Sequence, residues 1–290
     1  MSNTRKSSSA AHVYRFEGQS SCINILNQEK AKCTTSPITF TNVSHDQLQL
    51  LLKSLPEAFI TKYTHIYSES KLIVKLSETT MQSTTARRIM YTIEDWLKSM
   101  GLDDVLTLLD KEASHGANGD VKSADCSVFI TAQYTKTGKL SEWPVIVLEV
   151  EATEREFKLS DDVCQWMTMT EGMIAAMLTV KWAPGIIIAS LWGLPSRLMR
   201  RRQTGPFNAD SVQVLQEIRV CKIENHISIS PESRDTAIII KFDDVFEGST
   251  ISRDVQKQDL ILDYHYFAAL LEELEQKNAE RQELMARRGD

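Results

Sequence analysis

Long apolar runs are missing from this sequence. No stretch of roughly 18 or more consecutive apolar residues occurs, so a helix that crosses a membrane is not expected. Residues 1–11 are polar, are expected to be disordered, and lack the apolar centre of a secretory signal. We therefore expect an intracellular protein, nuclear or cytoplasmic, with no membrane partner.

Cysteine is also scarce. The 290 residues include five cysteines, and no two of them have the spacing of a metal site or a redox pair. They are Cys22, Cys33, Cys126, Cys164 and Cys221. We expect reduced thiols in packing positions, as in a protein from a reducing compartment.

Positive charge is in deficit. The chain has 33 Lys and Arg against 39 Asp and Glu, which gives a net charge of -6. A protein built to coat nucleic acid usually carries a basic face or stripe, and this balance argues against that class. One dense basic cluster occupies residues 197–202. It can contact phosphates or serve as a nuclear address, or it can be a solvated loop.

Several catalytic signatures are absent. The sequence has no Gly-x-Ser-x-Gly elbow, no Gly-rich phosphate loop of the Walker type and no dinucleotide fingerprint. It also has no His-x-x-x-His or Cys-x-x-Cys pair. The hydrophobic content of 42% and charged content of 25% are ordinary for a globular domain, and the length is ample for a core.

Acidic residues at the ends of two apolar runs are the most informative feature present. Asp125 opens the run that follows it, and Glu149 and Glu151 close a run that begins at Trp143. A Gly-containing turn at residues 136–139 predicts that the two runs form a hairpin. Period-2 alternation puts Glu149 and Glu151 on one face of their strand. Converging carboxylates need a counter-charge, for which Mg²⁺ or Mn²⁺ is suited.

The flanking pattern alternates helices and strands. We expect helices over residues 44–55, 84–100, 103–112, 159–177 and 256–287. We expect further strands over residues 71–76, 178–182, 186–192, 212–220 and 236–242. The helix at 256–287 carries an apolar stripe of Leu260, Tyr264, Phe267, Leu271 and Leu274. The domain division expected is a variable, partly disordered segment (1–43), a core domain (44–250) and this C-terminal helix.

These pieces resemble the PD-(D/E)XK nuclease superfamily, which has the restriction-endonuclease-like fold. The resemblance is closest to a group of fungal, largely uncharacterised members. It rests on Ala124-Asp125, on Trp143-Pro144 through Glu149, and on the acidic-aromatic helix segment from Asp161 to Trp166, and it spans roughly residues 60–245. It implies an α/β fold with a mixed central sheet flanked by helices, followed here by the long C-terminal helix.

The resemblance also implies roles for single residues. Asp125 and Glu149 match the metal ligands, and Glu94 matches an acid that many members carry on the first core helix. Alternatively, Glu94 forms an i,i+4 pair with Lys98. The position of the motif lysine is held by Glu151, which can act as a base, a ligand or a salt-bridge partner. Lys158 is the nearest replacement for the lysine, or else a surface cation.

The function implied is metal-dependent hydrolysis of a phosphodiester in DNA or RNA, with Mg²⁺ or Mn²⁺ as cofactor. The departure at Glu151 makes a degenerate nuclease possible. The alternative is a non-catalytic interaction or regulatory protein that retains the nuclease fold. In that case the C-terminal helix would dock a protein partner or a second copy of the chain. Metal binding at Asp125 and Glu149 would separate the two hypotheses.

Overall fold

The structure is a computed structural model, and it describes residues 12–32, 37–55, 60, 62–76, 79–109, 113–116, 118–152, 158–195, 207–224, 226–251 and 255–288. The contacts between residues divide the chain into two compact units. Unit 1 comprises residues 1–78 and 115–123, and unit 2 comprises residues 79–114 and 124–290.

Unit 1 is built on a six-stranded sheet in the order β1-β2-β4-β3-β7-β6. Strand β1 runs parallel to β2, whereas β2, β4, β3 and β7 are antiparallel neighbours. The strands are β1 (His12–Arg15), β2 (Ile38–Thr41), β3 (Lys62–Ile66), β4 (Lys71–Lys75), β6 (Ala113–His115) and β7 (Val121–Ser123), and the helices are α1 (Gln19–Ala31) and α2 (His45–Ser54). The segment 1–43 therefore contains β1, α1 and β2.

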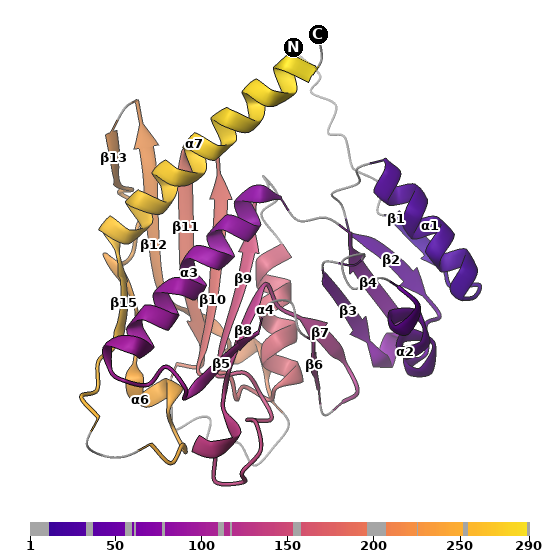
Figure 1. The fold of residues 1–290 in the computed structure, drawn as a ribbon, viewed down its shortest axis with the longest axis horizontal. Coiled ribbons are helices and arrows are strands. Elements are labelled where there is room, and N and C mark those ends of the chain that lie inside the picture. The colour runs from indigo at the N-terminus through magenta and orange to yellow at the C-terminus, as the bar shows by residue number, and fades with distance from the viewer. Residues whose placement is uncertain are drawn as a thin grey trace. The chain divides into compact units, whose positions relative to one another are not determined.

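Unit 2 is built on a seven-stranded mixed sheet in the order β13-β12-β11-β10-β9-β8-β5, with a separate two-stranded sheet of β14 and β15 (Figure 1). The strands are β5 (Leu106–Leu109), β8 (Cys126–Ile130), β9 (Ile146–Glu151), β10 (Ala176–Ala183), β11 (Ile186–Gly193), β12 (Gln213–Ile223), β13 (His226–Ile229), β14 (Ala237–Ile240) and β15 (Leu260–Asp263). The helices are α3 (Thr80–Ser99), α4 (Lys158–Met169), α6 (Phe242–Val245) and α7 (Tyr264–Arg288). The predicted mixed α/β fold, with helices flanking a sheet and a long helix at the C-terminal end, is confirmed.

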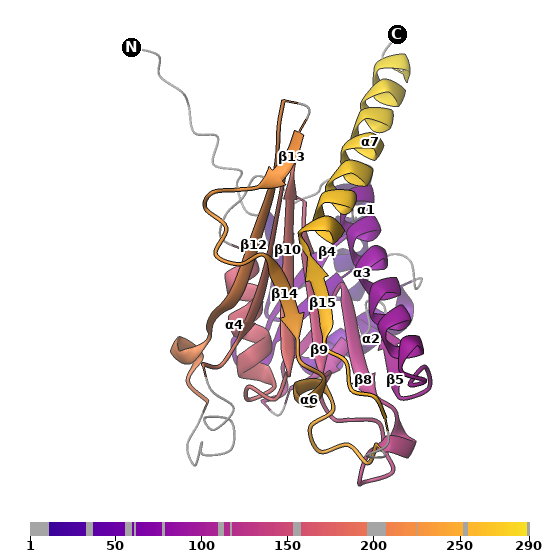
Figure 2. The same ribbon diagram turned by 90° about the vertical axis from the view of Figure 1, so that its left-hand side faces the viewer.

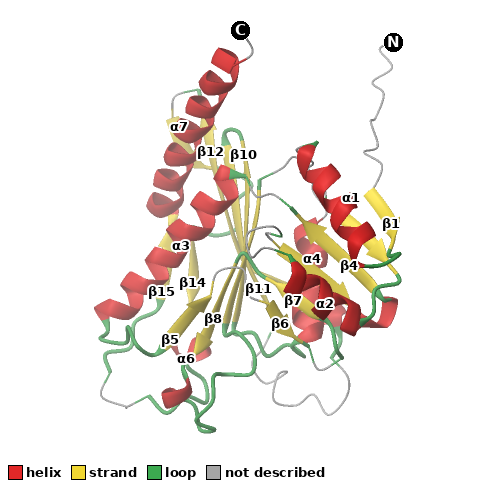
Figure 3. Ribbon diagram, turned by 45° about the vertical axis from the view of Figure 1, so that its right-hand side comes forward, coloured by secondary structure: helices red, strands yellow, loops and turns green. Residues whose placement is uncertain are grey.

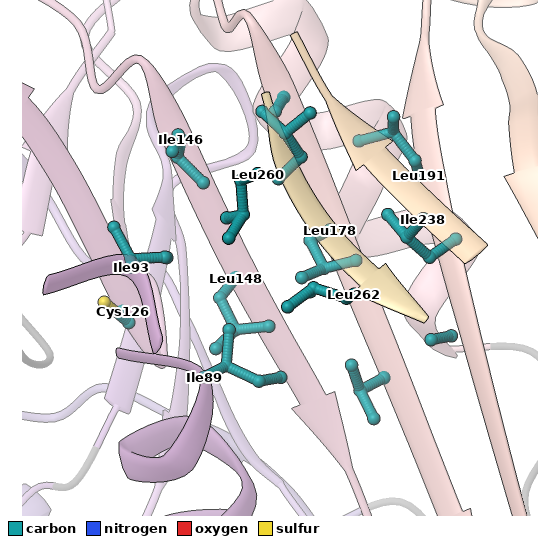
Figure 4. Close-up of a cluster of buried hydrophobic side chains, with 14 of the residues drawn as sticks. Ile89, Ile93, Cys126, Ile146, Leu148, Leu178, Leu191, Ile238, Leu260 and Leu262 are labelled. Carbon is teal, nitrogen blue, oxygen red and sulfur yellow. The ribbon is translucent and has the colours of Figure 1, made fainter. Parts of the chain in front are cut away.

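One face of the larger sheet is apolar. Helices α3 and α7 run side by side across this face (Figure 1, Figure 3), tied by an ion pair between Arg88 and Glu273 at 3.5 Å. Alternate residues of the strands, such as Leu148 and Leu178, point into the core beneath the helices (Figure 4). Ile238, Leu260 and Leu262 of β14 and β15 fill the same core. These side chains are almost wholly buried, and their removal from water is the main force that holds this face together.

Helix α4 covers the opposite face of the sheet (Figure 2) and provides the crossover between the parallel strands β9 and β10. Its Trp166 and Met167 pack with Val147 and Met177 in a second apolar cluster. The helix ends at Met169, well before the predicted residue 177, because the backbone turns left-handed at Glu171 and Gly172. Gly172 has φ +73°, and a Cβ there would lie 2.7 Å from the ring of Phe207.

The ends of several elements follow their local sequence. Ser44 and Gln47 form a capping box at the start of α2. Gly101 follows α3 in a left-handed conformation, as expected for a helix stop. The strands predicted at residues 71–76, 178–182, 186–192 and 212–220 are confirmed as β4, β10, β11 and β12.

Three other expectations were wrong in part. The helix predicted over residues 103–112 is replaced by strand β5, because Leu106–Leu109 pairs with β8 in antiparallel register. The predicted strand over residues 236–242 stops at Ile240 and gives way to α6. The C-terminal helix begins at Tyr264 rather than at residue 256, because Leu260–Asp263 forms β15 against β14.

The basic cluster at residues 197–202 lies outside the described residues. Among the helices of the described ranges, none has the length and apolar character needed to cross a membrane.

Candidate functional site

The predicted hairpin of β8 and β9 brings Asp125 against the end of β9 that carries Glu149. Cys126 pairs with Leu148 across the two antiparallel strands, and both side chains lie in the core under α3 and α7. Glu149, the next residue of β9, therefore faces the other way, toward the side covered by α4, and Asp125 immediately precedes β8. Asp125 and Glu149 are both buried, with 3% and 1% of their surface exposed.

Both carboxylates accept hydrogen bonds, one from a backbone N–H and one from an indole N–H. The Oδ2 atom of Asp125 accepts a bond of 2.6 Å from the backbone N–H of Val150. The Oε1 atom of Glu149 accepts a bond of 2.6 Å from the indole N–H of Trp166 on α4. Short bonds of this kind to a carboxylate stabilise its charged form and fix its orientation. Asp125 is thus fastened to the backbone between Glu149 and Glu151.

Glu151 lies on the same strand face as Glu149, as period-2 alternation predicted, and its exposed fraction is 8%. The structure therefore gathers Asp125, Glu149 and Glu151 at the C-terminal end of β9. Lys158 is the first residue of α4, but its side chain lies outside the described part of the structure.

Gln82 is a residue of this site that the sequence did not reveal. Its side-chain Nε2 donates a 3.1 Å hydrogen bond to the carbonyl of Val150, and its Oε1 accepts from the N–H of Thr79. Gln82 and Thr79 form a capping box at the start of α3, so this helix begins beside the acidic strand end. The pattern Thr-x-x-Gln at residues 79–82 predicts the helix cap, but it does not indicate that Gln82 also bonds to β9.

Glu94 is not brought to the other acids. It lies on α3 twelve residues after Gln82, which corresponds to about 18 Å along the helix axis. Its carboxylate pairs with Lys98 at 3.8 Å, the i,i+4 arrangement that was the alternative for this residue.

A row of buried polar side chains extends from Glu149 across the sheet. Strand register aligns Glu149 with Thr179, Thr179 with Ser190, and Ser190 with Glu217. Thr179 accepts a 2.8 Å bond from the indole N–H of Trp192, and Ser190 donates a 3.3 Å bond to Glu217. All four residues are less than 10% exposed. The polar row (Glu149, Thr179, Ser190 and Glu217) lies on the face opposite the apolar core.

The electrostatic surroundings of α4 are acidic as well. Burial raises the pKa of the Cys164 thiol, and the nearby carboxylates of Asp161 and Asp210 raise it further. A thiol with a raised pKa is less often in the reactive thiolate form, although Cys164 itself is exposed on α4.

Hard oxygen donors of this kind suit Mg²⁺, which is usually held by one or two carboxylates together with water and substrate phosphate oxygens. Asp125 and Glu149 supply such a pair, fixed in place by Val150 and Trp166. Within the ranges that the structure describes, no three His, Cys, Asp or Glu side chains form a group that could hold a metal. Asp125 and Glu149 therefore fit a cation that takes two ligands from the protein, and they do not fit a site with three protein ligands.

Comparisons with known proteins add little to this site. No protein-family model matches the chain, and no curated protein matches it. One solved structure that matches is described as "a putative nuclease belonging to DUF820 from Anabaena variabilis ATCC 29413". It is 13% identical, covers 59% of this chain and 83% of its own, and has a TM-score of 0.38. That TM-score is too low to carry an argument, so the site is interpreted from its own residues.

Proposed function

We propose that unit 2 is a metal-dependent phosphodiesterase domain of the PD-(D/E)XK type, which hydrolyses DNA or RNA. The observation that carries the proposal is the bond from the Val150 N–H to Asp125, since it ties this carboxylate to the residue that follows Glu149 in β9. Buried carboxylates are costly unless they bind partners or a metal, and two neighbouring acids on one strand face are more costly still.

Asp125 and Glu149 would hold Mg²⁺ or Mn²⁺. When bound, the cation supplies charge stabilisation to the phosphate and lowers the pKa of water. In the overall reaction, a water molecule adds to phosphorus, one P–O ester bond breaks, and a phosphomonoester and an alcohol result. Glu151 takes the proton released by the attacking water, and the leaving ester oxygen takes a proton from solvent.

Trp166 and Gln82 position the site in this proposal. Trp166 holds the Glu149 carboxylate through Oε1, and Gln82 anchors the strand between the two glutamates to the first turn of α3. Fixed orientation matters because small displacements of a catalytic group reduce the rate strongly.

The test compares wild type with Glu149→Gln and with a matched control, Glu217→Gln. Glu217 is also a buried carboxylate of the polar row, about 14 Å from Glu149 across three strand spacings. Thermal unfolding is followed while Mn²⁺ is added, and each protein is incubated with single- and double-stranded DNA and RNA. We expect metal stabilisation and cleavage in wild type and Glu217→Gln, and the loss of both in Glu149→Gln.

Absence of both responses in wild type would contradict the proposal. The alternative would then hold, namely a non-catalytic interaction protein that docks a partner or a second copy through the end of α7. That segment carries an exposed apolar residue, Leu284, which is 56% exposed. Sedimentation of the full chain and of Leu284→Glu would test it, since self-association through α7 predicts a change in mass for the variant.

A further inference from the structure

The candidate site contains three carboxylates. Glu149 and Glu151 share one face of β9, the backbone of Val150 between them binds Asp125, and a phosphodiester substrate would add a further negative charge. Like charges a few ångströms apart in a partly buried site repel one another. A phosphate can bind there only if fixed positive charge faces it, and a protein cation commonly contributes part of that charge.

Strand register places one lysine beside the acids. Lys181 of β10 is the direct partner of Glu151 across the parallel pair β9–β10, just as Thr179 is the partner of Glu149. Neighbouring strands lie about 4.8 Å apart, so the two side chains leave the sheet side by side. Val180 and Trp182, on either side of Lys181, point into the apolar core. Lys181 therefore points to the opposite face, which is the face of the acids.

The ammonium of Lys181 is available for a ligand. The side chain is half-buried, and the described part of the chain shows no hydrogen bond or ion pair for it. Another cation of this face, Arg219 of β12, is two strands further away and is already engaged. Its guanidinium donates to Glu217 at 2.9 Å and to Glu232 at 2.8 Å.

We propose that Lys181 is a catalytic residue that binds a non-bridging oxygen of the scissile phosphate and stabilises the charge that develops there during hydrolysis. This inference rests on the proposed function. A lysine is suited to the role because its compact ammonium, on a long flexible stem, can follow the phosphate as negative charge accumulates. From β10 the ammonium would face Glu151 and the substrate. Strand β9 has an acid, Glu151, at the position of the motif lysine, so the positive charge would come from the neighbouring strand.

The test uses the full chain with Lys181→Met, Lys181→Arg and the control Lys222→Met. Lys222 is an exposed lysine of β12. It lies on the same strand face as Ile218 and Val220, which point into the apolar core, so it is on the sheet face opposite Lys181. Hydrolysis is measured with Mn²⁺ on the nucleic acid that wild type cleaves. Binding of the same oligonucleotide is measured by fluorescence anisotropy over a range of KCl, with Ca²⁺ in place of Mn²⁺.

We expect Lys181→Met to lower kcat about 100-fold or more, as for loss of one group that stabilises the transition state, while KM changes by less than about threefold. Lys181→Arg should recover part of the rate, and Lys222→Met should stay within about twofold of wild type. Loss of one phosphate contact should also reduce the slope of log affinity against log salt by about 0.7 to 0.9. A merely structural lysine would change the melting temperature without these effects.

Other outcomes separate the two proposals. If Lys181→Met hydrolyses the substrate at the wild-type rate and Glu149→Gln does not hydrolyse it, the role of Lys181 is overturned and the nuclease function stands. If wild type binds nucleic acid without cutting it, an unchanged salt slope in Lys181→Met overturns the phosphate contact, and a reduced slope supports it. If wild type neither binds nor cleaves DNA or RNA, both proposals fail.

Discussion

The two faces of the seven-stranded sheet in unit 2 differ sharply in chemistry. Helices α3 and α7 lie on one side of the sheet and α4 on the other (Figure 2). Alternate residues of the same strands build the apolar core under α3 and α7, and on the α4 side they form the polar row and Glu151 beside the smaller apolar cluster. Leu148 and Glu149 are adjacent in β9, and Leu178 and Thr179 are adjacent in β10. One strand can thus supply stability through one set of residues and a reactive site through the other, because its side chains alternate.

Loss of core volume should give the largest effect on stability. Leu178→Ala removes a wholly buried side chain from the apolar face, and we expect the free energy of unfolding to fall by about 2–5 kcal/mol. Urea unfolding measures the change. The response of the remaining folded protein to Mn²⁺ should be that of wild type, and a lost metal response would show that the two faces are not independent.

Removal of the Glu149 side chain should have a smaller effect on stability. Glu149→Ala leaves the buried indole N–H of Trp166 without its acceptor, which costs about 1–3 kcal/mol. Glu149→Gln keeps an acceptor oxygen, so its unfolding free energy should remain within about 1 kcal/mol of wild type. Both variants are measured by urea unfolding without metal. Equal destabilisation by Ala and Gln would contradict the structural importance of the Trp166 bond.

Gln82 ties the start of α3 to β9, and its loss should have an intermediate effect. Gln82→Ala removes half of the capping box of α3 and the bond to the Val150 carbonyl, and we expect about 1–2 kcal/mol of destabilisation. The rate of any hydrolysis should fall as well, because the strand that carries the glutamates loses its anchor. Ser83→Ala, on the same helical turn, is the control and should leave the rate unchanged.

The smallest effect is expected within the polar row. Ser190→Ala removes one 3.3 Å bond to Glu217, whose carboxylate keeps the bond from Arg219. We expect less than about 1 kcal/mol of destabilisation in thermal or urea unfolding. A cost comparable to that of Leu178→Ala would mean that the polar row contributes to stability as much as the core does.

Local sequence predicted the parts of this molecule that depend on neighbouring residues. Alternation around Glu149 identified β9 and its acidic face, and the turn at residues 136–139 implied the hairpin with β8. Helical spacing identified α3, although its start at Thr80 is earlier than predicted. Each of these features is encoded within one continuous segment, so periodicity and cap residues were sufficient.

The remaining features depend on contacts between distant segments. Thr179, Ser190 and Glu217 join Glu149 only through the register of four strands, and no local pattern specifies which residues meet. For the same reason Lys181 could not be recognised from the sequence as the neighbour of Glu151. Strand β5 was mistaken for a helix because its apolar residues fit either period until pairing with β8 decides between them.

The bond between Trp166 and Glu149 gives the site an optical signal of its own. The indole ring of Trp166 is fully buried, and its N–H lies against the carboxylate proposed to bind the cation. A change in the charge of that carboxylate alters the electric field across the indole, and thereby the wavelength and yield of its fluorescence. Occupancy of the site can therefore be followed in the unlabelled protein, with Trp166→Phe assigning the emission among the five tryptophans of the chain.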